Sequence, residues 1–389
     1  MAAMVLSAFP AQAQYVFATI DDPVAVANDG TTYVTGISGD LVVGYYYGPQ
    51  VHGFYHTLGT TNYVTLDVPA GTSSTSSSTV ANGVSGNSIV GYYDATNSSG
   101  RYGFIYNIAT SNYTALVNMG VSDGNTVYIE ALGVDGTNVV GNVIDLEPLV
   151  GTLQESFLFT LTAEGDNDSL FYYPSPSQIV PDGSITLTNY TTRAYGISGP
   201  NIVGYWVDES EYSHGYVYNI NAHNYTSVPG PGNQDSPLTG INGNNVVGNY
   251  ADPSYSYNNS GFIYNLTTDT YTTSLHDPLA PGNSFLTGIY GSTIVGYYLD
   301  NEGSTHGFVA TMPIPVLDLK VVGAKQIFTA TNGVAGASCY LLDTTSLVLP
   351  VNQWSELSSN MFNASGVFFY TNQIIPNMPP TFYVLSKTP

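Results

Sequence analysis

The chain has 389 residues, of which 43% are hydrophobic and only 8% are charged, and its formal net charge is −23. Its 41 glycines and 33 tyrosines are typical of a β-rich protein with many turns. All but three of the 28 acidic residues lie before residue 314, where Arg101 and Arg193 are the only lysine or arginine side chains. Such a charge repels phosphate groups, which disfavours nucleic acids and anionic membrane surfaces as partners.

Residues 1–14 read MAAMVLSAFPAQAQ, a short apolar run that ends in Ala11-Gln12-Ala13. This pattern is typical of signal-peptidase cleavage, so we expect these residues to be the remnant of a signal peptide. No later stretch approaches the ~20 uninterrupted apolar residues of a membrane span. The sequence therefore predicts a secreted protein without membrane insertion, and we expect it to be a monomer.

A strand is predicted directly after this segment. Residues 15–23 read YVFATIDDP, and their last seven residues, FATIDDP, superimpose on YVTLDVP at 63–69, which ends the first of six repeats. The stretch at 15–23 is therefore interpreted as the last strand of a repeat whose beginning does not precede it.

Six copies of one pattern follow. They read GISGDLVVGYY (36–46), GVSGNSIVGYY (83–93), GVDGTNVVGNV (133–143), GISGPNIVGYW (196–206), GINGNNVVGNY (240–250) and GIYGSTIVGYY (288–298). Each copy continues with a second apolar run, such as HGFYH in the first, and usually with Tyr-Thr-x-Leu. Short runs of β-branched and aromatic residues between Gly, Asn, Asp and Ser predict strands, here four in a repeat, A to D.

The sixth repeat stops after HGFVATMP at 306–313 and lacks strand D, which the stretch at 15–23 can supply. A spare strand at one end and a missing strand at the other are typical of a closed ring, whereas an open array needs polar caps. The sequence predicts an all-β fold, with a six-bladed β-propeller at 15–313 closed by its N-terminal strand. We expect the repeated glycines to allow close strand packing or a positive φ in the turns. The repeated tyrosines are expected to fill the space between adjacent blades, with ligand stacking by individual exposed tyrosines, as in carbohydrate binding, as the alternative.

The third repeat departs from the pattern with an insertion at about 162–190, TAEGDNDSLFYYPSPSQIVPDGSITLTNY. Segments that depart from a repeated template can carry functional residues. We interpret the insertion as a solvated surface loop, with a substrate lid as the alternative.

After residue 313 the repeats stop and the lysines appear. We expect Trp354 to lie in a core or at a hydrophobic edge of this region, and the single cysteine, Cys339, to be a buried small hydrophobe without a disulfide partner. A small β-sandwich is predicted at 314–389. Its strands are expected at 316–330, 338–343, 353–359, 364–371 and 381–386.

The repeat pattern HGFxYN…YTxL…GIxGxxIVGYY resembles a bacterial extracellular repeat family named after its His-Ala-Phe (HAF) triplet, with glycine in place of alanine at Gly53, Gly215 and Gly307. The third repeat, with ESFLF, departs from this pattern. The stretch from YLLDTTSLVLP to PPTFYVL (340–385) looks like an immunoglobulin- or fibronectin-like C-terminal module of secreted bacterial proteins. Both resemblances imply export, and neither implies an enzymatic activity.

An aspartate follows the strand B glycine by three or four residues in five of the six repeats. We expect these side chains on the face of the propeller that carries the loops between strands B and C. Carboxylates there could bind calcium, cap their own turns or bind another ligand, and the three options stay open. The five candidate ligand-binding residues are Asp94, Asp145, Asp208, Asp252 and Asp300.

His52, His214 and His306 begin strand C in three repeats. Because they occupy one template position on different blades, we expect them to pack and to form hydrogen bonds rather than to bind a metal. The sequence contains no H-E-x-x-H, G-x-S-x-G, P-loop or C-x-x-C motif, so it predicts no catalytic residue and no cofactor other than calcium.

These features favour a secreted, non-catalytic extracellular repeat protein that acts as a binding or scaffold module at the cell surface or in the matrix. Its expected partner is an extracellular glycan or a protein. The alternative is a polysaccharide-active hydrolase or lyase with its site on the face of the B-to-C loops, because propeller folds host both. Two carboxylates, or a carboxylate with a histidine, meeting in one pocket would favour the enzyme.

Overall fold

The computed structural model describes residues 15–28, 30–68, 76–95, 100–116, 127–147, 151–162, 165–171, 191–208, 210–234, 236–255, 258–312, 315–331, 333, 338–363, 366–374 and 379–386. Residues 1–14, the predicted signal-peptide remnant, lie outside this part of the chain. The chain divides into two compact units, one of residues 17–310 and one of residues 1–16 with 311–389. Both are built from β-strands, which confirms the predicted all-β class.

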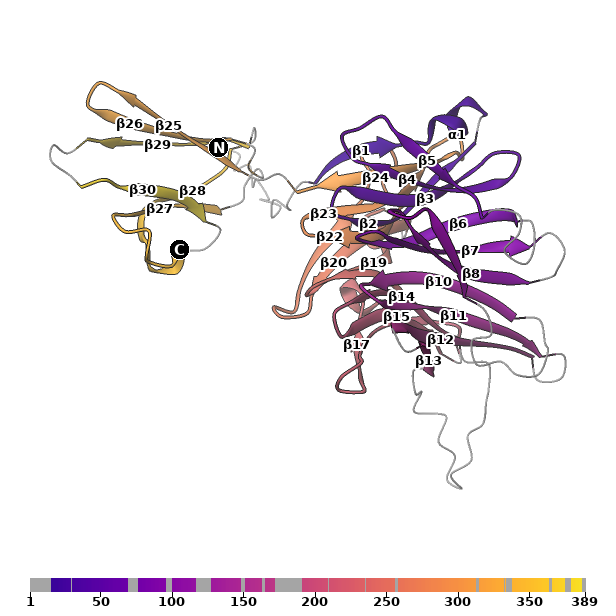
Figure 1. Ribbon diagram of the computed structural model, residues 1–389. Coiled ribbons are helices and arrows are strands. Elements are labelled where there is room, and N and C mark those ends of the chain that lie inside the picture. Colours follow the sequence, from indigo (N-terminus) through magenta and orange to yellow (C-terminus); the bar gives the residue numbers. More distant parts are fainter. Residues whose placement is uncertain are drawn as a thin grey trace, which may run out of the picture. The chain divides into compact units, whose positions relative to one another are not determined.

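The first unit consists of six groups of antiparallel strands, one for each repeat (Figure 1). Single parallel bridges from β4 to β6 and from β8 to β10 join the first three groups into one sheet. These groups are β2 (Thr32–Ser38), β3 (Leu41–Tyr47), β4 (Val51–Thr57) and β5 (Tyr63–Leu66); β6 (Ser76–Ser85), β7 (Ser88–Ala95), β8 (Arg101–Asn107) and β9 (Asn112–Leu116); and β10 (Val127–Asp135), β11 (Asn138–Glu147), β12 (Gly151–Thr162) and β13 (Gly165–Phe171).

The other three groups form separate four-stranded sheets, and the sixth draws one strand from outside its own repeat. Their strands are β14 (Thr192–Ser198), β15 (Asn201–Val207), β16 (Ser213–Asn219) and β17 (Asn224–Val228); β18 (Leu238–Asn242), β19 (Asn245–Asp252), β20 (Asn258–Asn265) and β21 (Thr270–Leu275); and β22 (Ser284–Tyr290), β23 (Thr293–Leu299) and β24 (Thr305–Thr311).

The repeated motif folds as a tight hairpin of strands A and B. The second glycine of G-I-x-G has a positive φ in every repeat, between 54° and 60°, a conformation that residues with a side chain rarely adopt. Along strand B, a Cβ at Gly44 would overlap the carbonyl oxygen of Tyr33 and the ring of Phe54. The aromatic residue of strand C fills this space and is fully buried in each group. These residues are Phe54, Phe104, Phe157, Tyr216, Phe262 and Phe308.

Strands A of neighbouring groups contact each other in chain order, from β2 through β6, β10, β14 and β18 to β22, and β22 also contacts β2. The first glycine of each motif faces the next one, and a Cβ on it would stand 3.0–3.4 Å from the Cα of its neighbour. Thr287 Oγ1 donates a hydrogen bond to the carbonyl oxygen of Val34 at 2.8 Å, which joins the sixth group to the first. The expectation of close packing at the glycines is confirmed. The six glycines are Gly36, Gly83, Gly133, Gly196, Gly240 and Gly288.

The strand β1 (Val16–Ile20) completes the sixth group by pairing with β24. The ring of Phe17 lies 5.2 Å from that of Phe308, and the backbone oxygen of Ile20 lies over Gly307, where a side chain would overlap it. The prediction that the stretch at 15–23 supplies the missing strand is therefore confirmed.

The stretch Gly165–Phe171 pairs with β12 in continuous register and forms the outer strand of the third group. It belongs to the insertion that we interpreted as a surface loop, and for these residues that interpretation is wrong. Their sequence, GDNDSLF, lacks the run of β-branched and aromatic residues that signals a strand, and pairing with β12 overrides this weak local preference. Residues 163–164 and 172–190 of the insertion lie outside the described residues.

The second unit contains two three-stranded sheets, β25-β26-β29 and β28-β27-β30. Their side chains share one core, in which the rings of Phe328 and Tyr383, from different sheets, lie 4.7 Å apart, as expected of a small β-sandwich. Cys339 is buried in this core, as predicted. Trp354 is partly exposed, and its indole donates to the carbonyl oxygen of Leu349 at 3.0 Å. The strands are β25 (Val316–Val322), β26 (Lys325–Thr331), β27 (Ser338–Thr344), β28 (Ser355–Met361), β29 (Phe368–Gln373) and β30 (Phe382–Ser386).

Helices are short in the described residues. The helix α1 (Pro23–Ala27) follows β1 and is capped by Asp22, whose carboxylate accepts a hydrogen bond from the N–H of Val24 at 2.8 Å. None of the helices in the described part of the chain has the length and hydropathy that a membrane crossing requires. Three 3₁₀ helices cover Pro231–Asn233, Pro253–Tyr255 and Val351–Gln353.

Deletion of residues 15–22 removes β1 and leaves β24 as an unpaired edge with Phe308 uncovered. Because exposed edge strands pair with other chains, we expect the truncated protein to aggregate and to melt at a lower temperature than the full chain. Size-exclusion chromatography and calorimetry measure both effects. Deletion of residues 1–14 is the control and should change neither. A truncated protein that stays monomeric with an unchanged melting temperature contradicts the role of β1.

Candidate functional site

The first unit contains a cavity of about 580 Å³ where strands A of all six groups meet. In every group the pairing of strands A and B skips the residue before the strand A glycine. Such a bulge changes where the neighbouring side chains point, and the skipped residue, the glycine and the following residue all line the cavity, as Thr35, Gly36 and Ile37 do. The volume suits a small ligand, so this cavity is the candidate site.

One position of the repeat carries a different residue in each copy and gives the cavity its chemical character. It lies three residues before the strand A glycine. Five of these six residues line the cavity, and the sixth, Tyr33, stacks on Tyr45, which lines it too. The six residues are Tyr33, Val80, Glu130, Arg193, Pro237 and Phe285.

Beside each of these residues stands the residue that follows the strand B glycine. In four groups this second residue is a tyrosine that lines the cavity. The two positions therefore build one layer of paired side chains around it. The second set consists of Tyr45, Tyr92, Asn142, Tyr205, Asn249 and Tyr297.

The first and sixth groups give the cavity an aromatic wall, formed by Tyr33, Tyr45, Phe285 and Tyr297. Tyr33 stacks on Tyr45 at 4.7 Å between ring centres, and Phe285 stacks on Tyr297 at 4.9 Å. An edge contact of 4.9 Å between Tyr33 and Tyr297 joins the two pairs. Since each ring is held by its neighbours, the wall is ordered before any ligand arrives.

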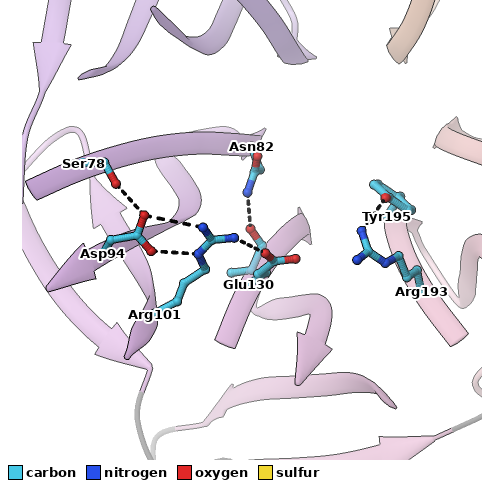
Figure 2. Close-up of polar contacts among 8 residues, drawn as sticks. Ser78, Asn82, Asp94, Arg101, Glu130, Arg193 and Tyr195 are labelled. Carbon is cyan, nitrogen blue, oxygen red and sulfur yellow. Dashed lines mark hydrogen bonds and ion pairs between the residues drawn. The ribbon is translucent and has the colours of Figure 1, made fainter. Parts of the chain in front are cut away.

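The second and third groups contribute an ion-pair network. Arg101 on β8 donates from Nη1 to Glu130 Oε1 on β10 at 2.5 Å and from Nε to Asp94 Oδ1 at 2.9 Å (Figure 2). Its guanidinium also lies 4.1 Å from the centre of the Tyr92 ring. Glu130 is 8% exposed and lines the cavity. The network therefore fixes a hydrogen-bonded carboxylate in the cavity wall.

Arg193, in the fourth group, lines the same cavity. Its Nη1 donates to the hydroxyl of Tyr195 at 3.3 Å (Figure 2). With the Gln154 amide turned so that its oxygen faces the guanidinium, that oxygen accepts from Nε and Nη2 at 2.8 and 2.9 Å. No ion pair among the described residues involves Arg193. Its charge thus stands in the wall with neutral hydrogen-bond partners.

The charges around the cavity cancel, although the chain as a whole is strongly acidic. The two arginines balance the carboxylates of Asp94 and Glu130. Burial raises the pKa of Tyr92 and of Tyr297 to about 12, so both hydroxyl groups keep their protons at neutral pH. The site therefore offers donors, acceptors and aromatic rings without a net charge.

Four of the five predicted aspartates have side chains that the structure describes, and three of these cap loops. Asp208, Asp252 and Asp300 each accept a hydrogen bond from the backbone N–H two residues later, at 2.8–2.9 Å, and so cap their own loops. Asp94 binds Arg101, and Asp145 lies in β11, with its side chain outside the described part. None of the four described side chains lines the cavity. Ligand binding by these residues stays a prediction.

Calcium binding also stays a prediction. The described residues contain no group of three or more His, Cys, Asp or Glu side chains placed to hold a metal ion. The hydrogen bonds from the N–H of Ser304, with those from His306 and Glu302, hold the pKa of Asp300 below its usual value. This carboxylate is therefore charged at neutral pH and already has partners within its own loop.

The strand C histidines pack and form hydrogen bonds, as predicted. Each packs against the second aromatic residue of strand B, for example His52 on Tyr46 at 5.2 Å between ring centres. Each also lies 2.8–2.9 Å from an aspartate oxygen, and for His306 this is Asp21, just after β1. Tyr46, Tyr93 and Tyr250 belong to buried clusters that span two neighbouring groups, as expected of the repeated tyrosines. The tyrosines one position earlier line the cavity instead, and for them the expectation is wrong. They are Tyr45, Tyr92, Tyr205 and Tyr297.

Sequence reasoning missed the cavity residues because it sought carboxylates that recur in the repeats. A position that differs between the copies could have revealed them. Three residues before the strand A glycine, the otherwise shared repeat carries Glu130 in the third copy and Arg193 in the fourth. Arg101 and Arg193 gave a second signal, since the first 313 residues contain no other arginine and no lysine.

No protein-family model matches the chain, and no curated protein does. Among solved structures, it is similar to a puromycin hydrolase mutant (8% identity, TM-score 0.40, 80% of this chain and 60% of the hydrolase) and to an oligogalacturonate lyase from Vibrio parahaemolyticus (12%, 0.44, 77% and 97%). A post-proline cleaving enzyme from Rickettsia typhi is similar over 79% of this chain and 50% of its own, at 7% identity and a TM-score of 0.40. Likenesses this distant say nothing about the activity of this chain.

The contact between His306 and the segment after β1 should make stability depend on pH. Partial burial alone would lower the pKa of His306, but Asp21, at 2.8 Å, and Asp300, at 3.3 Å, raise it. A raised pKa means that the contact stabilises the fold below the ordinary histidine pKa, and that this contribution is lost as the pH rises through the folded value. We expect His306→Asn to lower the free energy of unfolding by about 1 kcal/mol at pH 5.5 and by less at pH 9.

Urea unfolding of the wild type and of this variant at both pH values measures the difference. His223→Asn is the control, because His223 contacts the hydroxyl of Tyr218 and no carboxylate in the described residues, and its positive φ of 50° suits asparagine. A difference for His306→Asn that is equal at both pH values would show that its charge plays no part.

Proposed function

We propose that residues 15–313 form a closed six-bladed β-propeller that acts as a secreted, non-catalytic binding module and holds its ligand in the central cavity. Support for the ring comes from the contacts between strands A, which run through all six groups and return from β22 to β2. The pairing of β1 with β24 supports closure by the N-terminal strand. An open array would leave a first and a last group without such partners.

The observation that carries the binding role is the layer of paired side chains at the cavity. The repeats share their strand, turn and core residues but differ at the one position that gives this layer its chemistry. A position with a purely structural role in all six copies would be expected to carry similar residues, as the buried aromatic of strand C does. We attribute the difference to a ligand that contacts the six groups unequally.

Catalysis by a polysaccharide hydrolase or lyase remains the alternative, and the cavity favours binding over it. Glycoside hydrolysis needs two carboxyl groups that flank the bond. Of the described residues that line the cavity, Glu130 is the one with a carboxylate, none is a histidine, and Glu130 is tied to Arg101. These residues can fix a ligand, but they lack the pair of groups that would exchange protons with it.

Export and attachment complete the proposal. The apolar run before Ala11-Gln12-Ala13 supports secretion, and the resemblance to extracellular repeats and to an immunoglobulin- or fibronectin-like module supports a place at the cell surface or in the matrix. In this proposal the second unit serves as the attachment module, and calcium at the loop aspartates is an additional option.

A screen for ligands tests the cavity. We expect at least one soluble compound among mono- and disaccharides, amino acids and nucleosides to raise the melting temperature by about 2 °C or more at a saturating concentration. Leu132→Trp should abolish the shift, because Leu132 lines the cavity and the larger indole side chain there takes up space that the ligand needs. Leu279→Trp, at a position 65% exposed, is the control and should keep the shift. Shifts that survive in Leu132→Trp would place the ligand elsewhere.

A chromogenic polysaccharide panel, with and without EDTA, tests the absence of catalysis. We expect no turnover, and measurable turnover would replace the binding proposal by the enzyme. A melting temperature that falls with EDTA and recovers with added calcium would support the calcium option.

A further inference from the structure

The charged residues that line the cavity come from neighbouring groups on one side, and the aromatic wall comes from the groups opposite them. Tyr92, Tyr195 and Tyr205 add aromatic rings on the charged side as well. The aromatic wall belongs to the sixth and first groups, whereas Glu130 and Arg193 belong to the third and fourth. In the order in which strands A contact each other, β22 is three steps from β10, and β2 is three steps from β14. In the proposed ring, a ligand therefore lies between rings on one side and charged hydrogen-bonding groups on the other.

The aromatic wall suits an apolar face rather than a single apolar group. Tyr45, Phe285 and Tyr297 line the cavity, and their stacked pairs are nearly parallel, at 9° for Tyr33 with Tyr45 and 14° for Phe285 with Tyr297. Since the rings already pack on one another, little conformational entropy is lost when a flat face of C–H groups covers them.

The opposite wall suits hydroxyl groups. Glu130 accepts one hydrogen bond from Arg101 at Oε1, and its Oε2 has none from the described residues. Arg193 offers donors beside the hydroxyl of Tyr195. A hydroxyl group both donates and accepts, so one placed between Glu130 and Arg193 can satisfy both.

The charge of the site distinguishes among ligands of this shape. Because the arginines and carboxylates of the site cancel, an anionic ligand gains no net attraction there, and the acidic surface of the chain repels it. A cationic ligand is drawn to that surface, but inside the cavity the positive charge of Arg193 opposes the net negative charge of Arg101 with Asp94 and Glu130. An uncharged ligand is neither repelled by the acidic surface nor opposed by the charge of Arg193.

We propose, on the basis of the proposed cavity site, that the ligand is an uncharged saccharide. One pyranose ring lies with its C–H face on the aromatic wall, and its hydroxyl edge is held by Glu130 and Arg193. Arg101 is a positioning residue in this arrangement. It contacts Glu130, Asp94 and the ring of Tyr92, and it fixes the carboxylate that the sugar meets.

Calorimetric titration with three disaccharides of matched size tests the class of ligand: cellobiose, which is neutral; the glucosamine dimer, which is cationic; and digalacturonate, which is anionic. We expect cellobiose or another neutral disaccharide, such as maltose, lactose or N-acetylchitobiose, to bind at least 10-fold more tightly than either charged dimer. Added salt up to 0.5 M should leave that affinity unchanged, since the ligand carries no charge.

Variants test the two walls separately. We expect Arg193→Gln to weaken binding of the neutral disaccharide by about 10-fold or more, because hydrogen bonds to charged groups contribute most, and Tyr297→Leu to weaken it by a similar factor. Lys320→Gln in the second unit and Tyr290→Leu, at an exposed position of β22, are the matched controls and should bind as the wild type does. Circular dichroism and melting temperatures show whether each variant is folded.

A second measurement needs no variant. In saturation-transfer NMR on the wild type, irradiation of the aromatic protons should pass most strongly to the C–H protons on one face of one sugar ring. Uniform transfer along the disaccharide, or wild-type affinity in both Arg193→Gln and Tyr297→Leu, would overturn the assignment of the walls.

The ligand class and the proposed function can fail separately. Tighter binding of either charged dimer, or protection only by an amino acid or a nucleoside that Leu132→Trp abolishes, would overturn the neutral saccharide and leave the cavity as the binding site. A protein that no compound of either screen protects would overturn both proposals.

Discussion

The close approach of six glycines is the constraint on which the first unit depends. Gly36 and its equivalents bring neighbouring strands A so near that an added Cβ would stand 3.0–3.4 Å from the next Cα, closer than nearly all real contacts of a side chain. A larger residue there would force the neighbouring strand to shift by a few tenths of an ångström, so the glycines allow the strands to approach closely at one level. Above that level the bulge and the strand alternation turn the preceding residues toward the cavity. The same glycines therefore set both the packing of the groups and the position of the candidate site.

Much of this fold could be predicted from the sequence because the same pattern of strands and turns occurs six times. A comparison of the copies predicts the glycine with positive φ, the aromatic residue of strand C and the strand at 15–23. A single copy that departs from the pattern does not obscure it, because the other five share it. The strand Gly165–Phe171 was missed because it occurs once and has weak strand propensity. Its partner β12 determines it, and that contact cannot be read from local sequence.

The candidate site could not be predicted in the same way. A comparison of the repeats draws attention to the positions that all copies share. The charged groups of the cavity lie at a position where the copies differ. The ion pair of Arg101 with Glu130 joins strand C of one repeat to strand A of the next, a reach that depends on how the groups are placed in space. The loop aspartates drew attention because they recur, and Asp208, Asp252 and Asp300 recur for a local reason, which is that each caps its own turn.

The pairing of β1 with β24 has a consequence for biosynthesis. A ribosome adds about 5–20 residues each second, so the first strand of this unit waits roughly 15–60 s before its partner has been made. During that time Phe17 has no Phe308 to cover it, and the five earlier groups can assemble without it. The strand β1 is therefore the first of this unit to be translated, but it can pair only after the last one has been made. A cell that makes the chain must keep its beginning from pairing with other chains until nearly the whole first unit has emerged.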